Sequence, residues 1–541
     1  MMKTAASTRL LLSLGVLTIA SCCWLFAFNP SLIYPDAYDY AQMGREIARG
    51  NGFSSQQLLP RHIPFLAEHG LWDTRPWPNL YRYPATPFWV AATMLFIDDP
   101  IYASVIQSGI WFVLSALLVF LLASRFTNLG VAFFSALIFI SEPAIFESAH
   151  SGMTESFATL AILAFFLTAL GRTDTKWRWL LLGVICGVAY LTRTQLLILL
   201  PIGMGYLWFS QETTHRGKSI VLLLLGVVLA VSPWMMRNLD VAGDPLFSFS
   251  TSRNLVKQDH ATDIALDLNA DPYTLSLVRD NRAFIVSKFF RNLGLALTPF
   301  FWAKMFGLGF LVVLLFLPAA VFFTIKSRDS DHRRFHYGAA WLLLFTIIAV
   351  STASHHPRFY LPLKPLMIIA ASIGCWKVLL LWNRKRPASK VPTRLMAAAI
   401  PVGVFLCMFV SLQQQKENRQ RVAREEFHRS AHARLSEIIP TDAIIFSDVS
   451  FRVVLNADRP SIRLPRNPDE LWEIRTRFGE FDYILIGERH LNNAGAYAPT
   501  AYQDFVTSET FLSQFELLEI LSNGEKLYVR TNTAESPMND E

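Results

Sequence analysis

The segment PSLIYPDAYDYAQMGREIARGNGF, residues 30–53, places two aspartates directly after the first membrane-length apolar stretch of the chain. Pro35 and Asp36 are helix-start signals and Gly50 is a stop signal, so the segment predicts a short helix between them. Charged side chains beside hydrocarbon are costly and tend to mark functional positions. The segment therefore predicts a membrane protein with a candidate site at the end of its first span.

Asp36, Asp39 and Tyr40 fall close together on the first turn of this helix. A second interpretation is that Asp36 only caps the helix, where its charge favours the positive end of the helix dipole. Both interpretations stay open on this segment alone.

The composition indicates a polytopic membrane protein. Of the 541 residues, 52% are hydrophobic and only 17% are charged, and the mean hydropathy is +0.32. A soluble domain of this length is far less apolar. A membrane-spanning helix needs roughly 20 apolar residues, and the sequence offers about eleven such stretches. They lie near residues 9–29, 101–124, 129–147, 153–171, 178–192, 195–210, 218–236, 296–325, 337–353, 359–382 and 393–413.

The basic residues of the short connections predict the orientation. From Lys3 to Arg394, clusters of Lys and Arg recur in connections on one side, which identifies that side as the cytoplasm. The amino terminus is then cytoplasmic, and two long connections, residues 30–100 and 237–295, lie outside together with everything after residue 413. The net charge of +7 fits this bias and indicates no nucleic-acid partner.

The first external loop contains an aromatic segment, YRYPATPFWVAATMLF, residues 81–96, which is apolar but too short to span. Its aromatic side chains, Tyr83 and Trp89 among them, suit either a membrane-interface belt or a platform for stacking a sugar. We expect the segment to lie in the interface or to re-enter the membrane.

Ionisable residues recur at the external ends of the later spans. Arg193, Arg237 and Arg358 can each bind a phosphate through two parallel hydrogen bonds, and His356 and Glu155 lie at equivalent ends. Each arginine taken alone could instead extend to lipid phosphates or pair with a nearby carboxylate. Together they predict an anionic group bound at the outer leaflet.

The tail changes character after the last span. Residues 414–438 are strongly charged and favour helix, which predicts a solvated stalk. Residues 439–541 alternate strand and helix patterns and close with a hairpin turn at Asn523-Gly524. We therefore predict a polytopic α-helical domain over residues 1–413, with a large first periplasmic loop, and a small external α/β domain over residues 439–541.

The order of several motifs resembles the GT-C superfamily of integral-membrane glycosyltransferases. After the loop-one segment come YRYPATPFW, SGMTESFATL, GVAYLTRTQLLILLP, SPWMMRNLDVAGDPLF and HHPRFYLPLKPLM. Within the superfamily, the sequence is most similar to the bacterial branch around lipid A aminoarabinose transferase and the family-39-like protein O-mannosyltransferases. The resemblance covers roughly residues 10–415 and implies a GT-C-like fold.

The resemblance also implies an activity: transfer of a sugar from a polyprenyl-phosphate donor to a lipid, glycan or protein acceptor of the cell envelope, at the external face of a bacterial inner membrane. The family's loop-one aspartate falls on Asp36 and its span-four acidic position on Glu155. Its arginine positions fall on Arg193, Arg237 and Arg358. Relatives often have a basic residue directly before the loop-one proline, whereas here Tyr83 precedes Pro84 and the nearest cation is Arg82.

We assign the predicted roles accordingly. Asp36 is the catalytic base, with Asp39 and Glu155 as the other catalytic carboxylates. The three arginines and His356 are predicted to bind the donor phosphate. The sugar or acceptor is predicted to bind Tyr40, Arg82, Tyr83 and Trp89. The DxxD spacing of the two aspartates differs from the acidic pairs of the metal-dependent oligosaccharyltransferases, so we predict neither a catalytic metal nor a cofactor.

The chemistry needs few acidic groups. A lipid phosphate is already a good leaving group, so cations must neutralise its developing charge, and one carboxylate can take the acceptor proton. An aspartate with the ordinary pKa of about 3.9 is ionised at neutral pH and can act as this base. Direct displacement with one carboxylate predicts inversion at the anomeric carbon.

Two other classes stay open. A polytopic transporter or lipid flippase would be equally apolar, but it should show paired repeats and charge near the midplane of the membrane. A membrane scaffold with an external domain would explain the tail but neither the loop-one aspartates nor the external arginines.

Overall fold

The computed structural model describes residues 2–26, 32, 34–171, 177–209, 216–257, 263–272, 274–298, 301–302, 309–327, 329–353, 356–385, 409, 419–479, 481–487 and 501–531. The chain forms two compact units. We call Met1–Leu32, Tyr83–Asp240 and Phe289–Arg421 the helical unit. We call Ile33–Arg82, Val241–Lys288 and Val422–Glu541 the sheet unit.

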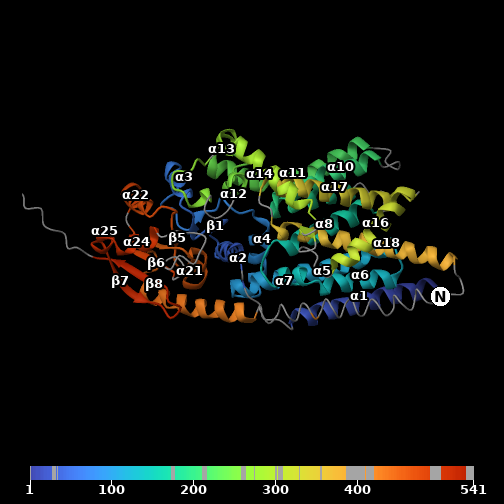
Figure 1. Cartoon of the computed structure of the whole chain (residues 1–541), viewed down its shortest axis with the longest axis horizontal. Helices are drawn as coiled ribbons and strands as arrows, with labels where there is room; N and C mark the ends of the chain where they lie inside the picture. The colour runs from blue at the N-terminus through green and yellow to red at the C-terminus, as the bar shows by residue number, and fades with distance from the viewer. Residues whose placement is uncertain are drawn as a thin grey trace, which may run out of the picture. The chain divides into compact units, whose positions relative to one another are not determined.

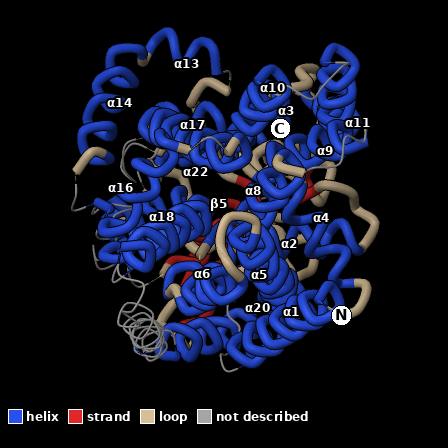
Figure 2. Tube along the Cα trace, turned by 90° about the vertical axis from the view of Figure 1, so that its right-hand side faces the viewer, coloured by secondary structure: helices blue, strands red, loops and turns tan. Residues whose placement is uncertain are grey.

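Apolar helices build the helical unit (Figure 1). They are α1 (Met2–Phe26), α4 (Ala85–Met94), α5 (Pro100–Ser124), α6 (Leu129–Ser141), α7 (Pro143–Ala149), α8 (Glu155–Ala169), α9 (Trp177–Thr192), η1 (Thr194–Ile198), α10 (Leu199–Phe209), α11 (Arg216–Ala242), α16 (Gly309–Lys326), α17 (Ser330–Thr352), η3 (Pro357–Leu363) and α18 (Lys364–Lys385), with α14 (Arg282–Ala296) divided between the units. Figure 2 shows α1, α5, α6 and α18 next to one another, and α5 contacts the other three.

Among the described residues, four helices are long and apolar enough to cross a membrane: Pro100–Ser124, Arg216–Ala242, Ser330–Thr352 and Pro357–Trp382. Shorter apolar helices occupy the predicted spans near residues 9–29, 153–171, 178–192, 195–210 and 296–325. The predicted span 393–413 lies outside the described residues, apart from residue 409. The helices therefore support a membrane protein, and the count of eleven spans stays a prediction.

Two helices joined at a sharp bend form the predicted span 129–147. Helices α6 and α7 meet at an angle of 66°. Pro143 has no N–H to continue the hydrogen-bond ladder of α6, and the Glu142 carboxylate instead accepts the backbone N–H of Ile145 at 2.8 Å. A proline and a capping side chain together start a new helix at this point.

Phenylalanines and glycines close the packing of the helical unit. Phe112, Phe139 and Phe165 are almost fully buried in its main core. Gly183 on α9 faces the backbone of α11, and Gly226 on α11 faces the backbone of α9, so a Cβ at either position would collide with the opposite helix. Small residues of this kind let helix backbones approach closely, as is common in membrane proteins.

A six-stranded sheet organises the sheet unit. Its strand order is β2-β5-β4-β6-β8-β7, formed by β2 (Gln57–Leu58), β4 (Ile445–Ser447), β5 (Ser461–Arg463), β6 (Tyr483–Ile486), β7 (Phe515–Ile520) and β8 (Lys526–Arg530). The first four strands pair in parallel, and β8 pairs antiparallel with both β6 and β7. The turn between β7 and β8 contains Gly524 with φ of +81°, as the predicted Asn523-Gly524 turn requires.

Short helices and a second small sheet complete this unit. The helices are α2 (Pro35–Ala48), α3 (His62–Glu68), α12 (Phe249–Val256), η2 (Ile264–Leu266), α13 (Thr274–Asp280), residues 419–433 in part, α20 (Leu435–Ile438), α21 (Ser450–Ala457), α22 (Asp469–Phe478), α24 (Ala501–Thr507) and α25 (Glu509–Leu512). Strands β1 (Ser54–Ser55) and β3 (Trp77–Pro78) pair antiparallel.

The sheet unit differs from the predicted division into separate loops and a tail domain over residues 439–541. Strand β2 belongs to the first long loop, yet Gln57 pairs with Ser461 and Leu58 with Ile462 of the tail. Residues 241–288 of the second long loop also belong to this unit. Strand pairing therefore joins the first loop to the tail. The second loop joins the tail through hydrogen bonds such as the one from the Arg466 N–H to the Leu266 carbonyl, at 2.8 Å.

Candidate active site

Helix α2 carries the two aspartates of the opening segment. The predicted helix is confirmed: it begins at Pro35, ends at Ala48, and is followed by Gly50 with φ of +86°. Proline suits the first helical position because its missing N–H would have no partner there. The N-cap is Tyr34, whose side chain makes no capping hydrogen bond. Asp36 lies two residues after Tyr34, within the first turn, and binds Arg82.

Asp36, Asp39 and Arg82 form what we call the carboxylate cluster. The Arg82 Nη2 donates to Asp36 Oδ1 at 2.7 Å and to Asp39 Oδ2 at 2.6 Å, and its Nε donates to the same Asp39 oxygen at 3.0 Å. The Asp36 side chain is 23% exposed and that of Asp39 is 15% exposed. One guanidinium therefore serves two carboxylates, and Asp36 is the more accessible of them.

The local chain holds Arg82 in place. The Asn79 side-chain oxygen accepts the backbone N–H groups of Tyr81 and Arg82, at 3.0 and 2.8 Å. The Arg82 guanidinium lies over the ring of Tyr81 at 4.6 Å and over the ring of Tyr40 at 5.4 Å. Tyr40 and Arg82, which we predicted to bind sugar or acceptor, are thus both part of the surroundings of the two aspartates.

Burial and charge act in opposite directions on this cluster. Burial raises the pKa of Asp39 above its usual value, although the neighbouring Arg82 works to lower it. Burial alone would lower the pKa of Arg82, but Asp36 and Asp39 outweigh it and the pKa of Arg82 rises. Arg82 therefore stays charged, whereas burial makes the ionised form of Asp39 less favourable.

Three further charged residues from the second long loop adjoin the cluster, and sequence reasoning missed them. Arg253 on α12 contacts the hydroxyl of Tyr81 and pairs with Asp263, its Nε lying 2.6 Å from Asp263 Oδ1. Lys257 Nζ lies 2.8 Å from Asp263 Oδ2. Burial lowers the pKa of Lys257, while Asp263 and Asp36 both act to raise it. These cations come from α12 and the residue after it, 214 residues or more from the aspartates in the sequence, so no local signal marked them.

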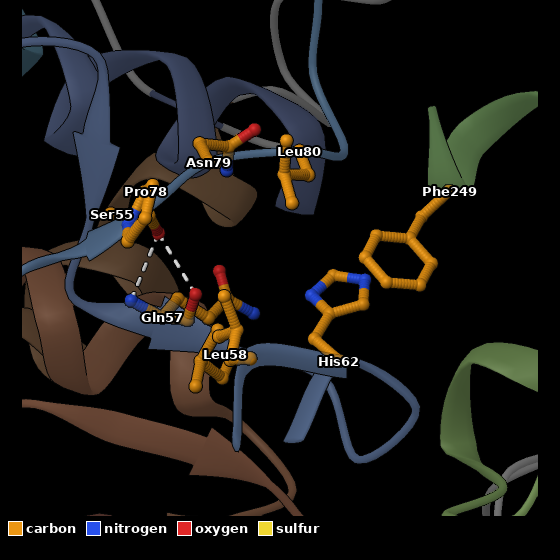
Figure 3. Close-up of a pocket in the computed structure, with 9 residues that line it drawn as sticks. Ser55, Gln57, Leu58, His62, Pro78, Asn79, Leu80 and Phe249 are labelled. Atoms are coloured by element: carbon orange, nitrogen blue, oxygen red, sulfur yellow. Dashed lines mark hydrogen bonds between the residues drawn. The ribbon is translucent and has the colours of Figure 1, made fainter. Parts of the chain in front are cut away.

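A small pocket lies in the same unit (Figure 3). Ser55, Gln57, His62 and Asn79 line it, together with the ring of Phe249, on which His62 stacks at 4.2 Å between centroids. Burial, with Arg61 and Arg253 nearby, lowers the pKa of His62 to about 3, so its ring is neutral at physiological pH. None of the residues predicted for the site lines this pocket.

In the helical unit, Glu155 and Arg193 form a buried ion pair. Arg193 Nε donates to Thr154 Oγ1 at 2.8 Å, and Arg193 Nη2 donates to Glu155 Oε1. Glu155 is the first residue of α8, where the helix dipole favours a negative charge. Arg193 Nη1 and Glu155 Oε2 are buried and have no hydrogen-bond partner among the described residues. The two predicted site residues thus bind each other and keep one donor and one acceptor available.

Two predicted phosphate-binding arginines converge on one aromatic ring. The guanidinium of Arg193 lies 5.5 Å from the ring centre of Phe359, and that of Arg358 lies 5.4 Å from the same ring. His356 is exposed, and its Nδ1 accepts the backbone N–H of Arg358 at 3.2 Å. Arg193, Arg358 and His356 therefore gather at the start of η3.

Arg237 is not part of this group in the described contacts. It is half-buried near the end of α11, where its Nη1 donates to Asn238 at 3.1 Å and its guanidinium lies over Trp234 at 5.2 Å. Its predicted role at the donor phosphate rests on the sequence alone.

The predicted aromatic platform splits into two parts. Tyr83 meets Tyr190 of α9 edge-on at 5.9 Å. The ring centre of Trp89, on α4, lies 5.0 Å from that of Trp111 and 5.8 Å from that of Phe157. Trp89 is 38% exposed. Packing against other aromatics and an exposed edge fit both a membrane-interface belt and a sugar-stacking surface.

A second buried ion pair in the helical unit was not predicted. Lys364, at the start of α18, is fully buried and its Nζ lies 2.5 Å from Glu142 Oε1. The same carboxylate caps α7, so Lys364 stabilises the break between α6 and α7. The two residues are 222 positions apart, so no local signal in the sequence marked them as partners.

In the part of the chain that the structure describes, no three His, Cys, Asp or Glu side chains lie close enough to hold a metal ion. The expectation of catalysis without a metal or cofactor stays a prediction.

Residues 82–236 match a family model described as dolichyl-phosphate-mannose-protein mannosyltransferase. The crystal structure of ArnT from Cupriavidus metallidurans in the apo state aligns with a TM-score of 0.60 at 12% identity, covering 97% of this chain and 98% of that one. The chain has the GT-C fold.

Other GT-C structures align over similar lengths. ArnT from the same organism bound to undecaprenyl phosphate aligns with a TM-score of 0.59 at 12% identity and covers 98% of this chain and 99% of that one. The archaeal oligosaccharyltransferase AglB from Archaeoglobus fulgidus, in complex with an inhibitory peptide and a dolichol-phosphate, aligns with a TM-score of 0.58 at 11% identity. It covers 99% of this chain and 75% of AglB.

Curated relatives match a shorter part of the chain. The undecaprenyl phosphate-alpha-4-amino-4-deoxy-L-arabinose arabinosyl transferase 2 of Proteus mirabilis is 26% identical over 224 residues, which are 39% of this chain. This chain spans 37% of the length of that relative. The family model covers Arg82, Glu155 and Arg193 but starts after both aspartates of the carboxylate cluster.

Proposed function

We propose that this protein transfers a sugar from a polyprenyl-phosphate-linked donor to an acceptor at the external face of the bacterial inner membrane, with inversion at the anomeric carbon. The acceptor is a lipid, glycan or protein of the cell envelope. The amino terminus is cytoplasmic and the sheet unit is external. The protein needs no metal or cofactor, since the donor itself carries the phosphate leaving group.

The carboxylate cluster is the observation that carries this proposal. Two carboxylates share one guanidinium, so the three groups keep one negative charge when both acids are ionised. Asp36 is the more exposed acid and accepts one hydrogen bond from Arg82, whereas a single Asp39 oxygen accepts two. A carboxylate at a helix start with part of its surface open is suited to take a proton from an acceptor group.

The proposed step balances without a further reagent. The acceptor oxygen or nitrogen attacks the anomeric carbon, and the bond from that carbon to the phosphate oxygen breaks. The electron pair leaves with the lipid phosphate, and the acceptor proton goes to Asp36. Asp39 and Arg82 hold Asp36 in its rotamer, and Arg82 keeps the excess charge low until the proton arrives.

Arg193, Arg358 and His356 are proposed for the donor phosphate, with Arg237 as an additional cation. Two observations support this role: Arg193 Nη1 has no hydrogen-bond partner in the part of the chain that the structure describes, and Arg193 and Arg358 both lie over the ring of Phe359. Glu155 orients Arg193 by pairing with its other nitrogen. Tyr40, Tyr83 and Trp89 are proposed for the sugar or acceptor.

The comparisons support the class of donor. The matching family model is described by its dolichyl-phosphate-mannose substrate, the curated relatives by their undecaprenyl phosphate-linked sugar, and one aligned structure by bound undecaprenyl phosphate. These names differ in sugar and acceptor but share a polyprenyl phosphate. The proposal therefore names the carrier class and leaves the sugar open.

Mass spectrometry of cell-envelope glycans from a deletion strain tests the proposal. We expect one sugar substituent to disappear in the deletion strain, to return with the wild-type gene, and to stay absent with the Asp36→Asn gene. Purified protein should release polyprenyl phosphate from a synthetic polyprenyl-phosphate sugar in the presence of envelope extract. An unchanged glycan profile together with transport of the intact donor across vesicles would instead identify a flippase.

A further inference from the structure

The amino-terminal end of helix α2 is attached to the tail of the chain. Tyr38 lies between the two aspartates in the sequence, and its hydroxyl donates to Glu425 Oε2 at 2.6 Å. Arg452 on α21 binds the same carboxylate through Nε at 3.0 Å and Nη2 at 2.5 Å. We call Tyr38, Glu425 and Arg452 the tyrosine triad.

The tyrosine triad is sheltered from water. The Tyr38 side chain is 3% exposed, and its ring meets Phe451 of α21 edge-on at 5.3 Å. Glu425 and Arg452 are 14% and 17% exposed. Burial, reinforced by the Glu425 carboxylate, raises the pKa of Tyr38, so its hydroxyl remains a hydrogen-bond donor at every physiological pH. Charge-assisted hydrogen bonds in such surroundings are stronger than those on a surface.

A second attachment lies near the other end of α2. Arg45 is buried and donates to the backbone carbonyls of Val454 and Leu455, at 3.2 Å or less, in the last turn of α21. Arg49 donates to both carboxylate oxygens of Asp458, the left-handed residue that ends α21. Carbonyls at a helix end lack partners within the helix and attract cations.

The two attachments lie about 10 Å apart along α2, because seven residues separate Tyr38 from Arg45 at 1.5 Å each. Both involve the same partner helix, α21. A helix fixed at two points along its length can neither rotate nor slide, and rotation is what would move Asp36 and Asp39 relative to Arg82.

We infer that the tail segment from Glu425 to Asp458 holds helix α2, and with it the carboxylate cluster, in position. Tyr38, Glu425 and Arg452 are then positioning residues for the transfer reaction. This inference rests on the proposed function of Asp36. It assigns the tail a role in positioning the residues of the chemical step.

Full-length protein with Tyr38→Phe, Glu425→Gln or both changes tests the inference. Each change removes one side of the Tyr38 contact and nearly preserves volume. Glu437→Gln is the matched control, because Glu437 is an exposed acid of the same tail segment that pairs only with exposed Arg434 among the described residues. The first readout is hydrogen exchange of the amides in residues 35–48, and the second is the kcat and KM for the polyprenyl-phosphate donor.

We expect faster exchange in α2 and a fall in kcat on the order of 10- to 100-fold for both single variants, with the donor KM unchanged. The double variant should be no worse than the more impaired single variant, since both changes remove one interaction. Arg452→Lys should retain more kcat than Arg452→Met. The Glu437→Gln protein should match the wild type in both readouts.

Two outcomes would overturn the inference: α2 exchange that stays at the wild-type rate in both single variants, or faster exchange with kcat equal to that of the control. Failure of the proposed function looks different. A wild-type protein that does not turn over any polyprenyl-phosphate sugar rejects the transferase proposal, while the exchange measurement still decides whether the tyrosine triad holds α2.

Discussion

The carboxylate cluster and the Glu155–Arg193 pair are both ion pairs of an arginine with acidic side chains, yet they differ in charge balance and exposure. Arg82 serves two aspartates that are 15–23% exposed. Arg193 serves one glutamate that is 3% exposed. The cluster therefore has an acid in excess near solvent, whereas the pair is neutral and enclosed.

This difference separates two kinds of chemistry. An excess carboxylate can accept a proton, and a neutral pair cannot readily do so without leaving a buried cation. The pair instead keeps an arginine nitrogen, Nη1, without a partner in the described part of the chain. A ligand with negative charge would satisfy that nitrogen, which suits a phosphate-binding role.

Asp36→Asn should cause the largest loss of transfer activity, because it removes the base from the carboxylate cluster. Asparagine can still accept a hydrogen bond from Arg82 and occupies nearly the same space, but it cannot take the acceptor proton. We expect transfer to fall by about a thousandfold, within the usual contribution of a general base. Asp39→Asn is the control and should lose less activity. Equal losses in both variants would show that the cluster acts as one unit and that the distinction between the two aspartates is wrong.

Arg82→Met should have the next largest effect. It leaves Asp36 and Asp39 adjacent without their counter-charge, so both the rotamer and the protonation state of Asp36 change. We expect kcat to fall by about a hundredfold, as small misplacements of reacting groups can cause. Arg82→Lys should restore part of the rate, because lysine keeps the charge but lacks the planar fork. A methionine variant with normal kcat would exclude a role for Arg82 in holding the base.

Arg193→Ala tests the role of the Glu155–Arg193 pair in binding the donor phosphate. We expect the donor KM to rise by roughly tenfold to a hundredfold, which corresponds to one charge-assisted hydrogen bond. Glu155→Gln should change the donor KM less, since it leaves the guanidinium in place. Arg237→Ala and Arg358→Ala should have smaller effects on KM. Normal transfer in all three arginine variants would refute the assignment of the phosphate site.

A pH dependence of stability is the smallest expected effect. Burial raises the pKa of Asp39 in the folded protein above its unfolded value. The stabilising contribution of protonated Asp39 is then complete below the unfolded pKa, about 3.9, and is lost as the pH rises through the folded pKa. Asp39→Asn removes this loss. Thermal unfolding in detergent should therefore show that the variant gains stability relative to the wild type as the pH rises. Melting temperatures of the two proteins that change in parallel with pH would contradict the raised pKa of Asp39.

Local signals in the sequence were sufficient for helix α2 and for its two aspartates. Pro35 and Gly50 bound the helix, and the spacing of Asp36 and Asp39 places them on one turn whatever the rest of the chain does. The break between α6 and α7 also had a local signal, Pro143, which the apolar character of residues 129–147 concealed.

Partners that lie far away in the sequence could not be predicted. Arg82 is 43 residues from Asp39, and Glu425 is 387 residues from Tyr38. Whether an arginine binds a ligand, a lipid or a neighbouring carboxylate depends on tertiary packing, and one sequence contains no record of it. The same limit applies to Lys364 and to strand β2, whose partners are in other segments of the chain.

The anomeric configuration of the product tests the central claim most directly. With a single base and no enzyme nucleophile, the acceptor attacks the anomeric carbon from the side opposite the phosphate. Proton NMR of the product formed from a donor of known configuration should show the opposite anomer. A product with the configuration of the donor would require a covalent sugar intermediate and would contradict direct displacement assisted by Asp36.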